Sequence, residues 1–162
     1  MKKVMIIMGS DSDWNVMKKA AAVLKEFGVD LEVHVSSAHR TPEKTVSLVE
    51  NFDGTCFIAG AGAAAHLAGV IAAHTVKPVI AVPINSGALH GVDALYATVQ
   101  MPSGVPVAAM AIDGAKNAGL FAVQILAASD AELAEKLKAY KIEMKDEVEK
   151  KDNKIQELIS EV

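Results

Sequence analysis

The sequence predicts an α/β protein, a three-layer sandwich in which helices cover both faces of a central parallel sheet of about five strands. Short apolar segments alternate with segments of helical periodicity, which is the order of elements in βαβ units. Several of these short segments are apolar at nearly every position, as is typical of strands buried on both faces of a parallel sheet. The length of 162 residues and the apolar fraction of 51% suit a single domain with a substantial core.

Each expected strand is an apolar run, and each is followed by a helical pattern. The strands are expected at residues 4–8, 31–35, 55–59, 79–82 and 107–111. The helices between and after them are expected at residues 14–27, 42–51, 63–74, 92–100 and 116–128. The second helix has the clearest start, because Thr41 is a candidate N-cap, Pro42 suits the first helical position and Glu43 suits the first turn.

From residue 130 to about residue 160 the sequence predicts one long C-terminal helix, capped by Ser129 or Asp130. Thirty helical residues measure about 45 Å, which exceeds the surface of so small a domain, so we expect the helix to pack on a neighbouring subunit. The pattern lapses at Lys151, where we expect a kink or fraying, and the alternative is a partly disordered tail after Val148. Apolar residues recur mostly every three or four positions, at Leu133, Leu137, Tyr140, Met144, Val148, Ile155 and Leu158.

Composition excludes several classes of function. The formal charge of −4 argues against a nucleic-acid surface, and no apolar run reaches the roughly 18 residues that span a membrane. The first apolar run is too short for a signal peptide, so we expect a cytoplasmic protein. Cys56 is the single cysteine and is expected to be a buried, inert thiol. No spacing of His, Asp or Glu predicts a metal site.

The most informative chemistry lies at His39 and Arg40. Arg40 is the single arginine of a chain that otherwise uses lysine, and only arginine grips phosphate or carboxylate with a planar fork of donors. Histidine is the side chain best suited to move protons near neutral pH. An anion clamp beside a proton shuttle predicts part of an active site. The alternative is a plain turn before a helix, and both interpretations can hold together.

Ligands bind beyond the carboxyl ends of the strands in an open parallel sheet, and three other segments fall there. Residues 9–14 (GSDSDW) offer glycine, the hydroxyls of Ser10 and Ser12 and free amides to a phosphate, or else form an ordinary N-cap. One of the two aspartates, Asp11 or Asp13, is expected to accept hydrogen bonds from sugar hydroxyls or from the backbone. Residues 60–69 are small enough for close approach of a flat ligand, and His66 either lines the pocket or caps the helix. Residues 83–91 form a further loop over it.

Taken together, four motifs resemble the class I 5-(carboxyamino)imidazole ribonucleotide mutase family of purine (IMP) biosynthesis. They are residues 8–14 (MGSDSDW), residues 37–42 (SAHRTP), residues 59–62 (AGAG) with His66 and Leu67, and residues 99–102 (VQMP). The resemblance covers almost the whole chain in order and spacing. It implies flavodoxin-like subunits, a cofactor-free homo-octamer, and an isomerase that moves a carboxylate from the exocyclic nitrogen to a ring carbon of a ribonucleotide. It divides the chain into a nucleotide-binding catalytic part, 1–129, and a helix, 130–162, of the same domain.

The resemblance also implies roles for individual residues. His39 matches the catalytic acid–base, and Ser37 lies with it beside the base. Ser10, Ser12, Asp13 and Arg40 match contacts to phosphate and ribose. Gly60, Ala61 and Gly62 match the wall over the imidazole. His66 and Leu67 match further substrate-binding residues.

The chain departs from the family pattern in four places. Ala63 stands where the family often has glycine, Ala68 where it often has proline and Asn85 where glutamine is common, and the turn at residues 113–115 is about two residues short. The resemblance keeps a related carboxylase that uses free carbon dioxide as the main alternative, which Arg40 and the small residues 60–69 disfavour. A flavodoxin-like FMN-binding protein is a second alternative, disfavoured because Trp14 is the one aromatic residue near a loop of the site.

Overall fold

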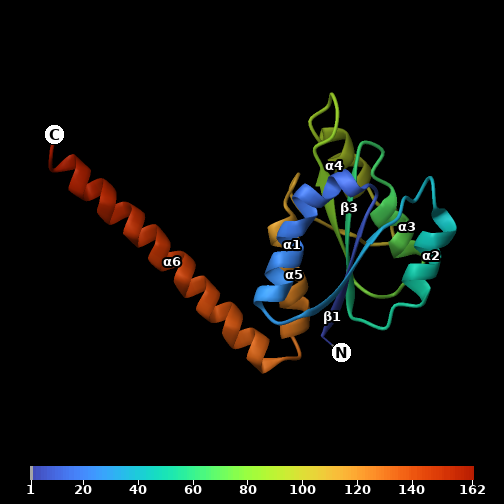
Figure 1. Ribbon diagram of the computed structural model, residues 1–162, viewed down its shortest axis with the longest axis horizontal. Helices are drawn as coiled ribbons and strands as arrows, with labels where there is room; N and C mark the ends of the chain where they lie inside the picture. The colour runs from blue at the N-terminus through green and yellow to red at the C-terminus, as the bar shows by residue number, and fades with distance from the viewer. Residues whose placement is uncertain (1) are drawn as a thin grey trace.

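A five-stranded parallel sheet forms the centre of the computed structural model, which describes residues 2–162 (Figure 1). The order is β2-β1-β3-β4-β5, which is the flavodoxin-like order, so the predicted fold class is confirmed. Every neighbouring pair of strands runs parallel. The strands are β1 (Lys3–Met8), β2 (Asp30–Val35), β3 (Cys56–Gly62), β4 (Val79–Ile84) and β5 (Ala108–Ala109).

Helices cover both faces of the central strands, and successive side chains of a strand point to opposite sides. On β1, Val4, Ile6 and Met8 pack with α1 and α5, whereas Met5 and Ile7 pack with α2 and α3. The two layers lie on either side of the sheet in Figure 1. The helices are α1 (Trp14–Glu26), α2 (Pro42–Glu50), α3 (Leu67–Ala73), α4 (Val92–Val99), α5 (Ala115–Ala127) and α6 (Ala131–Ile159), with a short 3₁₀ helix, η1 (Asp11–Asp13).

Helices α1 and α5 approach each other closely because α5 has glycine at the contact. A Cβ on Gly119 would lie 3.0 Å from the carbonyl oxygen of Ala20 and 3.0 Å from Cβ of Val23. Glycine therefore keeps the helices close enough to form one continuous layer against the sheet.

Four predicted boundaries were wrong. Strand β4 ends at Ile84 instead of residue 82. Strand β3 continues through Gly62 instead of ending at residue 59. The next helix starts at Leu67 and not at residue 63, because Ala63 has a φ of +50°, which no right-handed helix accommodates. Strand β5 has two residues where five were expected, since the chain soon turns at Asp113, whose φ is +58°.

The start of α2 was predicted correctly except for its cap. Thr41 precedes Pro42 at the N-cap position, but its hydroxyl makes no capping bond to the helix. It accepts instead from the backbone N–H of Ser37, at 2.9 Å. Thr41 thus stabilises the loop before the helix.

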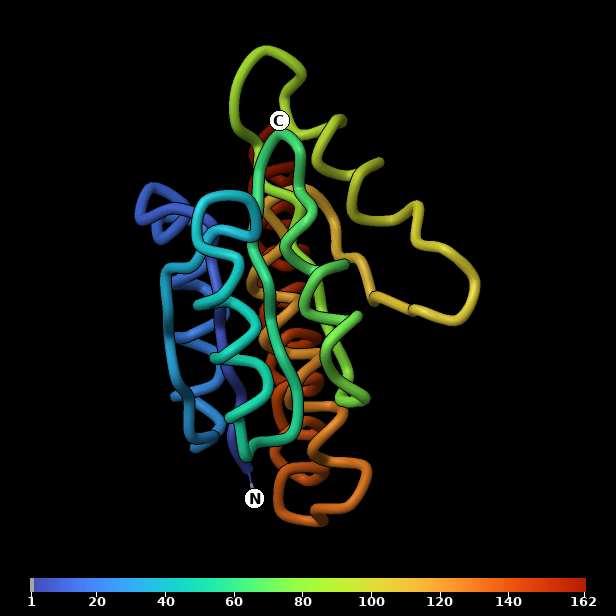
Figure 2. The backbone as a smooth tube through the Cα atoms, turned by 90° about the vertical axis from the view of Figure 1, so that its right-hand side faces the viewer, coloured from blue at the N-terminus to red at the C-terminus, as the bar shows by residue number. Residues whose placement is uncertain are grey.

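Helix α6 is a single unbroken helix, so the expected kink or disorder near Lys151 was wrong. Asp130 caps it, as one of the two predicted candidates, by accepting from the N–H of Leu133 at 3.0 Å. Its 29 residues measure about 44 Å, and the helix leaves the domain (Figure 1). In the turned view of Figure 2 it lies behind the domain. No helix among residues 2–162 is both long and apolar enough to cross a membrane.

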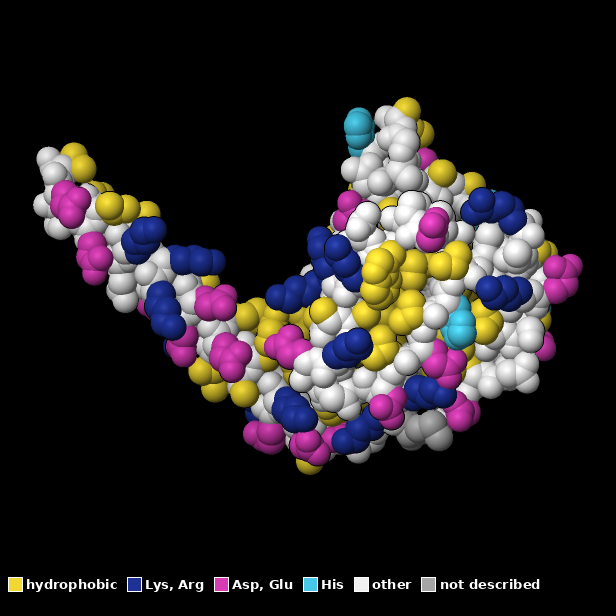
Figure 3. Space-filling view, in the orientation of Figure 1, with side chains coloured by type: hydrophobic (Ala, Val, Ile, Leu, Met, Phe, Trp, Pro, Cys, Tyr) yellow, Lys and Arg dark blue, Asp and Glu magenta, His cyan; other side chains and the backbone are white. Residues whose placement is uncertain are grey.

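The predicted apolar stripe of α6 divides into two parts. Leu133 is buried, and Leu137 and Tyr140 pack against the core of their own domain. Beyond Tyr140 the stripe has no partner within the described chain, and Figure 3 shows apolar side chains exposed along the helix to its end. The exposed part comprises Met144, Val148, Ile155 and Leu158, together with Ile142 and Ile159.

Candidate active site

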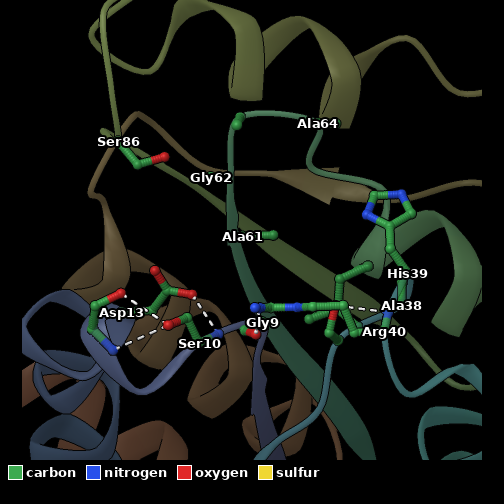
Figure 4. A pocket seen from close by; sticks show the side chains of 14 residues that line it. Gly9, Ser10, Asp13, Ala38, His39, Arg40, Ala61, Gly62, Ala64 and Ser86 are labelled. Carbon is green, nitrogen blue, oxygen red and sulfur yellow. Dashed lines mark hydrogen bonds between the residues drawn. The ribbon is translucent and has the colours of Figure 1, made fainter.

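A cavity of about 400 Å³ opens at the carboxyl ends of β1 to β4 (Figure 4). It lies at the point where the chain order of the strands reverses, between β1 and β3, which is where ligands bind in flavodoxin-like sheets. Of the residues predicted for the site, Gly60 and His66 do not line the cavity. All the others do, namely Ser10, Ser12, Asp13, Ser37, His39, Arg40, Ala61, Gly62 and Leu67. The further lining residues are Gly9, Ala38, Ala63, Ala64 and Ser86.

The loop after β1 is folded as a capping box around η1. The hydroxyl oxygen of Ser10 accepts from the N–H of Ser12 at 3.4 Å, and the N–H of Ser10 donates to the carboxylate of Asp13 at 3.0 Å. The prediction that one aspartate accepts from the backbone is therefore confirmed for Asp13. Burial raises the pKa of Asp13, opposed by the backbone N–H groups that it accepts from. The hydroxyls of Ser10 and Ser12 remain at the cavity, where an anion can be held.

The loop after β2 is held by a chain of hydroxyl groups beneath it. The Oγ of Ser36 lies 2.8 Å from Oγ1 of Thr45 and 3.2 Å from Oγ1 of Thr41, and Ser36 and Thr45 are both buried. Thr41 also bonds the backbone of Ser37. These bonds fix the turn from which the next side chains reach the cavity.

Arg40 joins the first two loops of the site. Its Nη2 donates to the carbonyl oxygen of Gly9 at 3.1 Å, and its Nε donates to Oγ of Ser37 at 3.3 Å. A guanidinium carries five N–H donors, so several remain for a ligand. Arg40, Ser10 and Ser12 line the same cavity, and such a set of donors is chemically able to hold an anion.

The end of β3 forms the floor of the cavity. Ala61 and Gly62 line it, whereas Gly60 lies deeper and its carbonyl oxygen accepts from the N–H of Gly9 at 3.1 Å. A Cβ on Gly60 would lie 2.5 Å from Sδ of Met17. Gly60 therefore lets α1 pack beneath the site.

His39 and His66 meet across the cavity rim. Nε2 of His39 lies 2.8 Å from Nδ1 of His66, and the ring planes cross at 79°. His66 occupies the N-cap position of α3 but makes no capping bond with its side chain, and it does not line the cavity. Its partner is His39, an arrangement that neither of the two sequence interpretations included.

Several lining residues were missed individually although their loops were predicted. Gly9, Ala38, Ala63 and Ala64 adjoin residues that carry a clear chemical signal, and small side chains give none of their own. Ser86 lies in the predicted loop 83–91, where the polar run Asn85-Ser86-Gly87 after an apolar strand was the available signal.

Other reactive groups lie outside the cavity. Cys56 is buried, and burial raises the pKa of its thiol to about 12, so it is an inert core residue as predicted. Within residues 2–162, no group of three or more His, Cys, Asp or Glu side chains is placed to hold a metal ion.

The strand order and the cavity at the switch point define an α/β protein of flavodoxin-like fold. The chain belongs to the AIR carboxylase family, whose sequence profile matches residues 3–147.

Relatives of known name are similar over nearly their whole length. The chain is 53% identical over 156 residues to a protein named N5-carboxyaminoimidazole ribonucleotide mutase from Pyrococcus horikoshii, covering 94% of this chain and 88% of the relative. It is 49% identical over 161 residues to the protein of the same name from Thermotoga maritima, covering 98% and 94%. The crystal structure of Treponema denticola PurE superposes with a TM-score of 0.85 at 33% identity, covering 94% of this chain and 97% of that one.

Proposed function

We propose that this protein is an isomerase of purine biosynthesis that converts 5-(carboxyamino)imidazole ribonucleotide to 5-amino-4-imidazolecarboxylate ribonucleotide. The observation that carries the proposal is the cavity itself, where an anion clamp at Arg40 and the proton-transferring side chain of His39 line one pocket. Relatives about 50% identical to the chain carry the name of this mutase.

The lining residues suggest one binding mode for the substrate. Its phosphate lies at Ser10, Ser12 and Arg40, and its ribose hydroxyls lie near Asp13. The imidazole ring lies over Ala61 and Gly62, where the absence of large side chains lets a flat ring approach the backbone. Ser37, His39 and Leu67 border the ring. His66 does not touch the ring and instead holds His39 through the hydrogen bond between the two imidazoles.

The reaction needs one proton out and one proton back. Protonation of the exocyclic nitrogen breaks its bond to the carboxylate, which leaves as carbon dioxide. The aminoimidazole that remains is an enamine, and its ring carbon C4 attacks the carbon dioxide. His39 gives the proton to the nitrogen and afterwards removes the proton from C4, so that it ends as it began. A closed pocket holds the carbon dioxide against C4 instead of losing it to water. The reaction so written uses no cofactor.

A substrate assay tests the proposal and separates it from the carboxylase alternative. Purified protein is given the carboxyamino ribonucleotide or aminoimidazole ribonucleotide, each with and without bicarbonate, and product is followed. A mutase forms product from the carboxyamino compound without added bicarbonate. A carboxylase forms it from aminoimidazole ribonucleotide and depends on bicarbonate. The proposal is overturned if product forms from aminoimidazole ribonucleotide and not from the carboxyamino compound.

The flavin alternative has less support in the cavity. A flavin ring is usually stacked on aromatic side chains. Among the described residues that line the cavity, His39 alone has an aromatic ring. Protein that purifies with a yellow colour would contradict this argument.

The proposed assembly is a homo-octamer in the cytoplasm, without nucleic-acid or membrane partners. Its support is the exposed apolar stripe on α6 beyond Tyr140, which needs a surface to cover it. A neighbouring subunit supplies that surface, so residues 130–162 serve both to close their own core and to join another copy.

A further inference from the structure

Four serine hydroxyls line the cavity, and three of them are engaged within the protein. Ser10 and Ser12 bond each other, with their Oγ atoms 3.0 Å apart, and Oγ of Ser37 accepts from Arg40. Ser86 differs, because within residues 2–162 its hydroxyl has no hydrogen-bond partner. Its O–H is therefore free for a ligand. The O–H of Ser37 is also unused, but the Ser37 oxygen is held by two bonds from Arg40 on the loop of His39.

The structure holds Ser86 in place from two sides. A Cβ on Gly62 would lie 2.0 Å from Oγ of Ser86 and 2.9 Å from its Cβ, so the serine side chain rests on the bare α-carbon of that glycine. The preceding residue is also fixed, since the N–H of Asn85 donates to Oδ1 of Asp113 at 2.9 Å. Ser86 is thus an exposed residue on a loop whose base is anchored.

The position of Ser86 in the sheet decides which part of a ligand it reaches. Its loop follows β4, two strands from β1, and neighbouring strands lie about 4.8 Å apart, so the loops are separated by about 10 Å. Arg40, Ser10 and Ser12 form the anion site on the β1 and β2 loops. In Figure 4, Ser86 and His39 lie on opposite sides of Ala61 and Gly62. Ser86 therefore faces the end of the substrate that is remote from the phosphate.

We propose that the hydroxyl of Ser86 donates a hydrogen bond to the carboxylate that the reaction moves, an assignment that rests on the proposed function. A carboxylate only accepts, and a free hydroxyl is a matching donor. His39 then transfers the proton from one side of the ring, and Ser86 binds the carboxylate from the other side. The bond orients the carboxyl group, and the carbon dioxide released from it, toward C4.

Binding measurements on Ser86→Ala test the assignment. Titration calorimetry with 5-amino-4-imidazolecarboxylate ribonucleotide measures the carboxylated ligand, and titration with aminoimidazole ribonucleotide measures the same ligand without the carboxylate. We expect the variant to bind the carboxylated ligand about 10-fold more weakly, because a hydrogen bond to a charged group is lost. Its affinity for the uncarboxylated ligand should equal that of the parent protein.

Ser86→Cys is the matched control, since it nearly keeps the shape and has only a weak donor. It should behave like Ser86→Ala. Three outcomes would overturn the assignment and leave the proposed function standing. They are parent-like binding by the cysteine variant, an equal loss of affinity for both ligands, and no loss of affinity for either ligand. A parent protein that neither binds nor converts the carboxylated ribonucleotides overturns the proposed function, and the Ser86 assignment with it.

Discussion

His39 and His66 are joined by a hydrogen bond of 2.8 Å, from Nε2 of the first ring to Nδ1 of the second, although 27 residues separate them in the chain. One ring must donate and the other must offer a lone pair, so the two nitrogens share one proton. The bond ties the loop after β2 to the start of α3 and fixes the orientation of His39 at the cavity. With Nε2 so engaged, Nδ1 is the nitrogen of His39 that remains for a ligand.

Replacing His39 with Asn should remove turnover and leave the fold intact. A general acid–base group contributes about 100- to 10,000-fold to the rate, and asparagine cannot exchange a proton. Turnover is measured with the carboxyamino ribonucleotide, and circular dichroism checks the fold. His66→Asn is the companion variant and should lose less, because it affects only the orientation of His39. Turnover near that of the parent in His39→Asn would remove the residue from the catalytic role.

Arg40→Lys should weaken substrate binding while keeping the positive charge. Lysine cannot donate to Gly9 and Ser37 while also presenting paired donors to a phosphate. We expect a raised KM with a smaller change in kcat, measured by steady-state kinetics. Arg40→Ala loses the charge as well and should raise KM further. An unchanged KM in the lysine variant would make Arg40 a structural link between loops.

A chain that ends after Tyr140 should form smaller assemblies than the full chain. This truncation keeps Leu133, Leu137 and Tyr140 on their own core and removes only the exposed part of the stripe. Burying each such side chain stabilises an interface by roughly 1.5–3 kcal/mol. Light scattering measures the subunit count. Val148→Gln should weaken assembly in the same sense, and Glu149→Gln on the same helix should not. A full subunit count in the truncated protein would assign assembly to the domain body.

Acid should selectively weaken the attachment of α6. The hydrogen bond from Lys2, and next the N–H of Leu133, hold the pKa of Asp130 below its ordinary value of 3.8. A carboxyl whose pKa is lower in the folded protein adds stability above its ordinary pKa, and this is lost as the pH falls through the folded value. Asp130→Ala should therefore lower the free energy of unfolding at neutral pH, and the difference from the parent should shrink below about pH 3.8.

Denaturant titrations at several pH values measure this difference. Asp130→Asn keeps a capping oxygen without the charge, so it should lie between the parent and the alanine variant at neutral pH. A gap between parent and Asp130→Ala that is the same at neutral and strongly acidic pH would show that the carboxylate charge is irrelevant.

Local sequence predicted the elements whose signals are local. The unbroken apolar run of β1 and Pro42 at the start of α2 were predicted correctly, and Asp130 was one of two predicted caps of α6, because each depends on neighbours in the chain. The start of α3 was misplaced because alanine is a strong helix former, and nothing in the sequence reveals that Ala63 has a positive φ. Propensity was overridden there by the geometry of the turn after β3.

The site was predictable as a set of loops but not as a set of contacts. Residue type and the rule on strand ends brought Ser10, His39 and Arg40 to one cavity. The pairing of His39 with His66 depends on how far α3 sits from the loop after β2, which only tertiary packing decides. The division of the α6 stripe at Tyr140 was hidden for the same reason, because the pattern is equally apolar on both sides of the point where the domain surface ends.

The two edges of the sheet differ in what they offer to another chain. β5 pairs with β4 at only two positions, so that edge presents almost no backbone for a further strand. β2 is a full six-residue strand at the other edge, with Val33 and Val35 partly open to solvent. Strand-by-strand growth of the sheet is thus open on one side only, and there Glu32 and His34 place polar side chains on the face of β2 opposite to Val33 and Val35. Partly unfolded copies should begin to aggregate at β2, and charge on that strand is the natural protection against it.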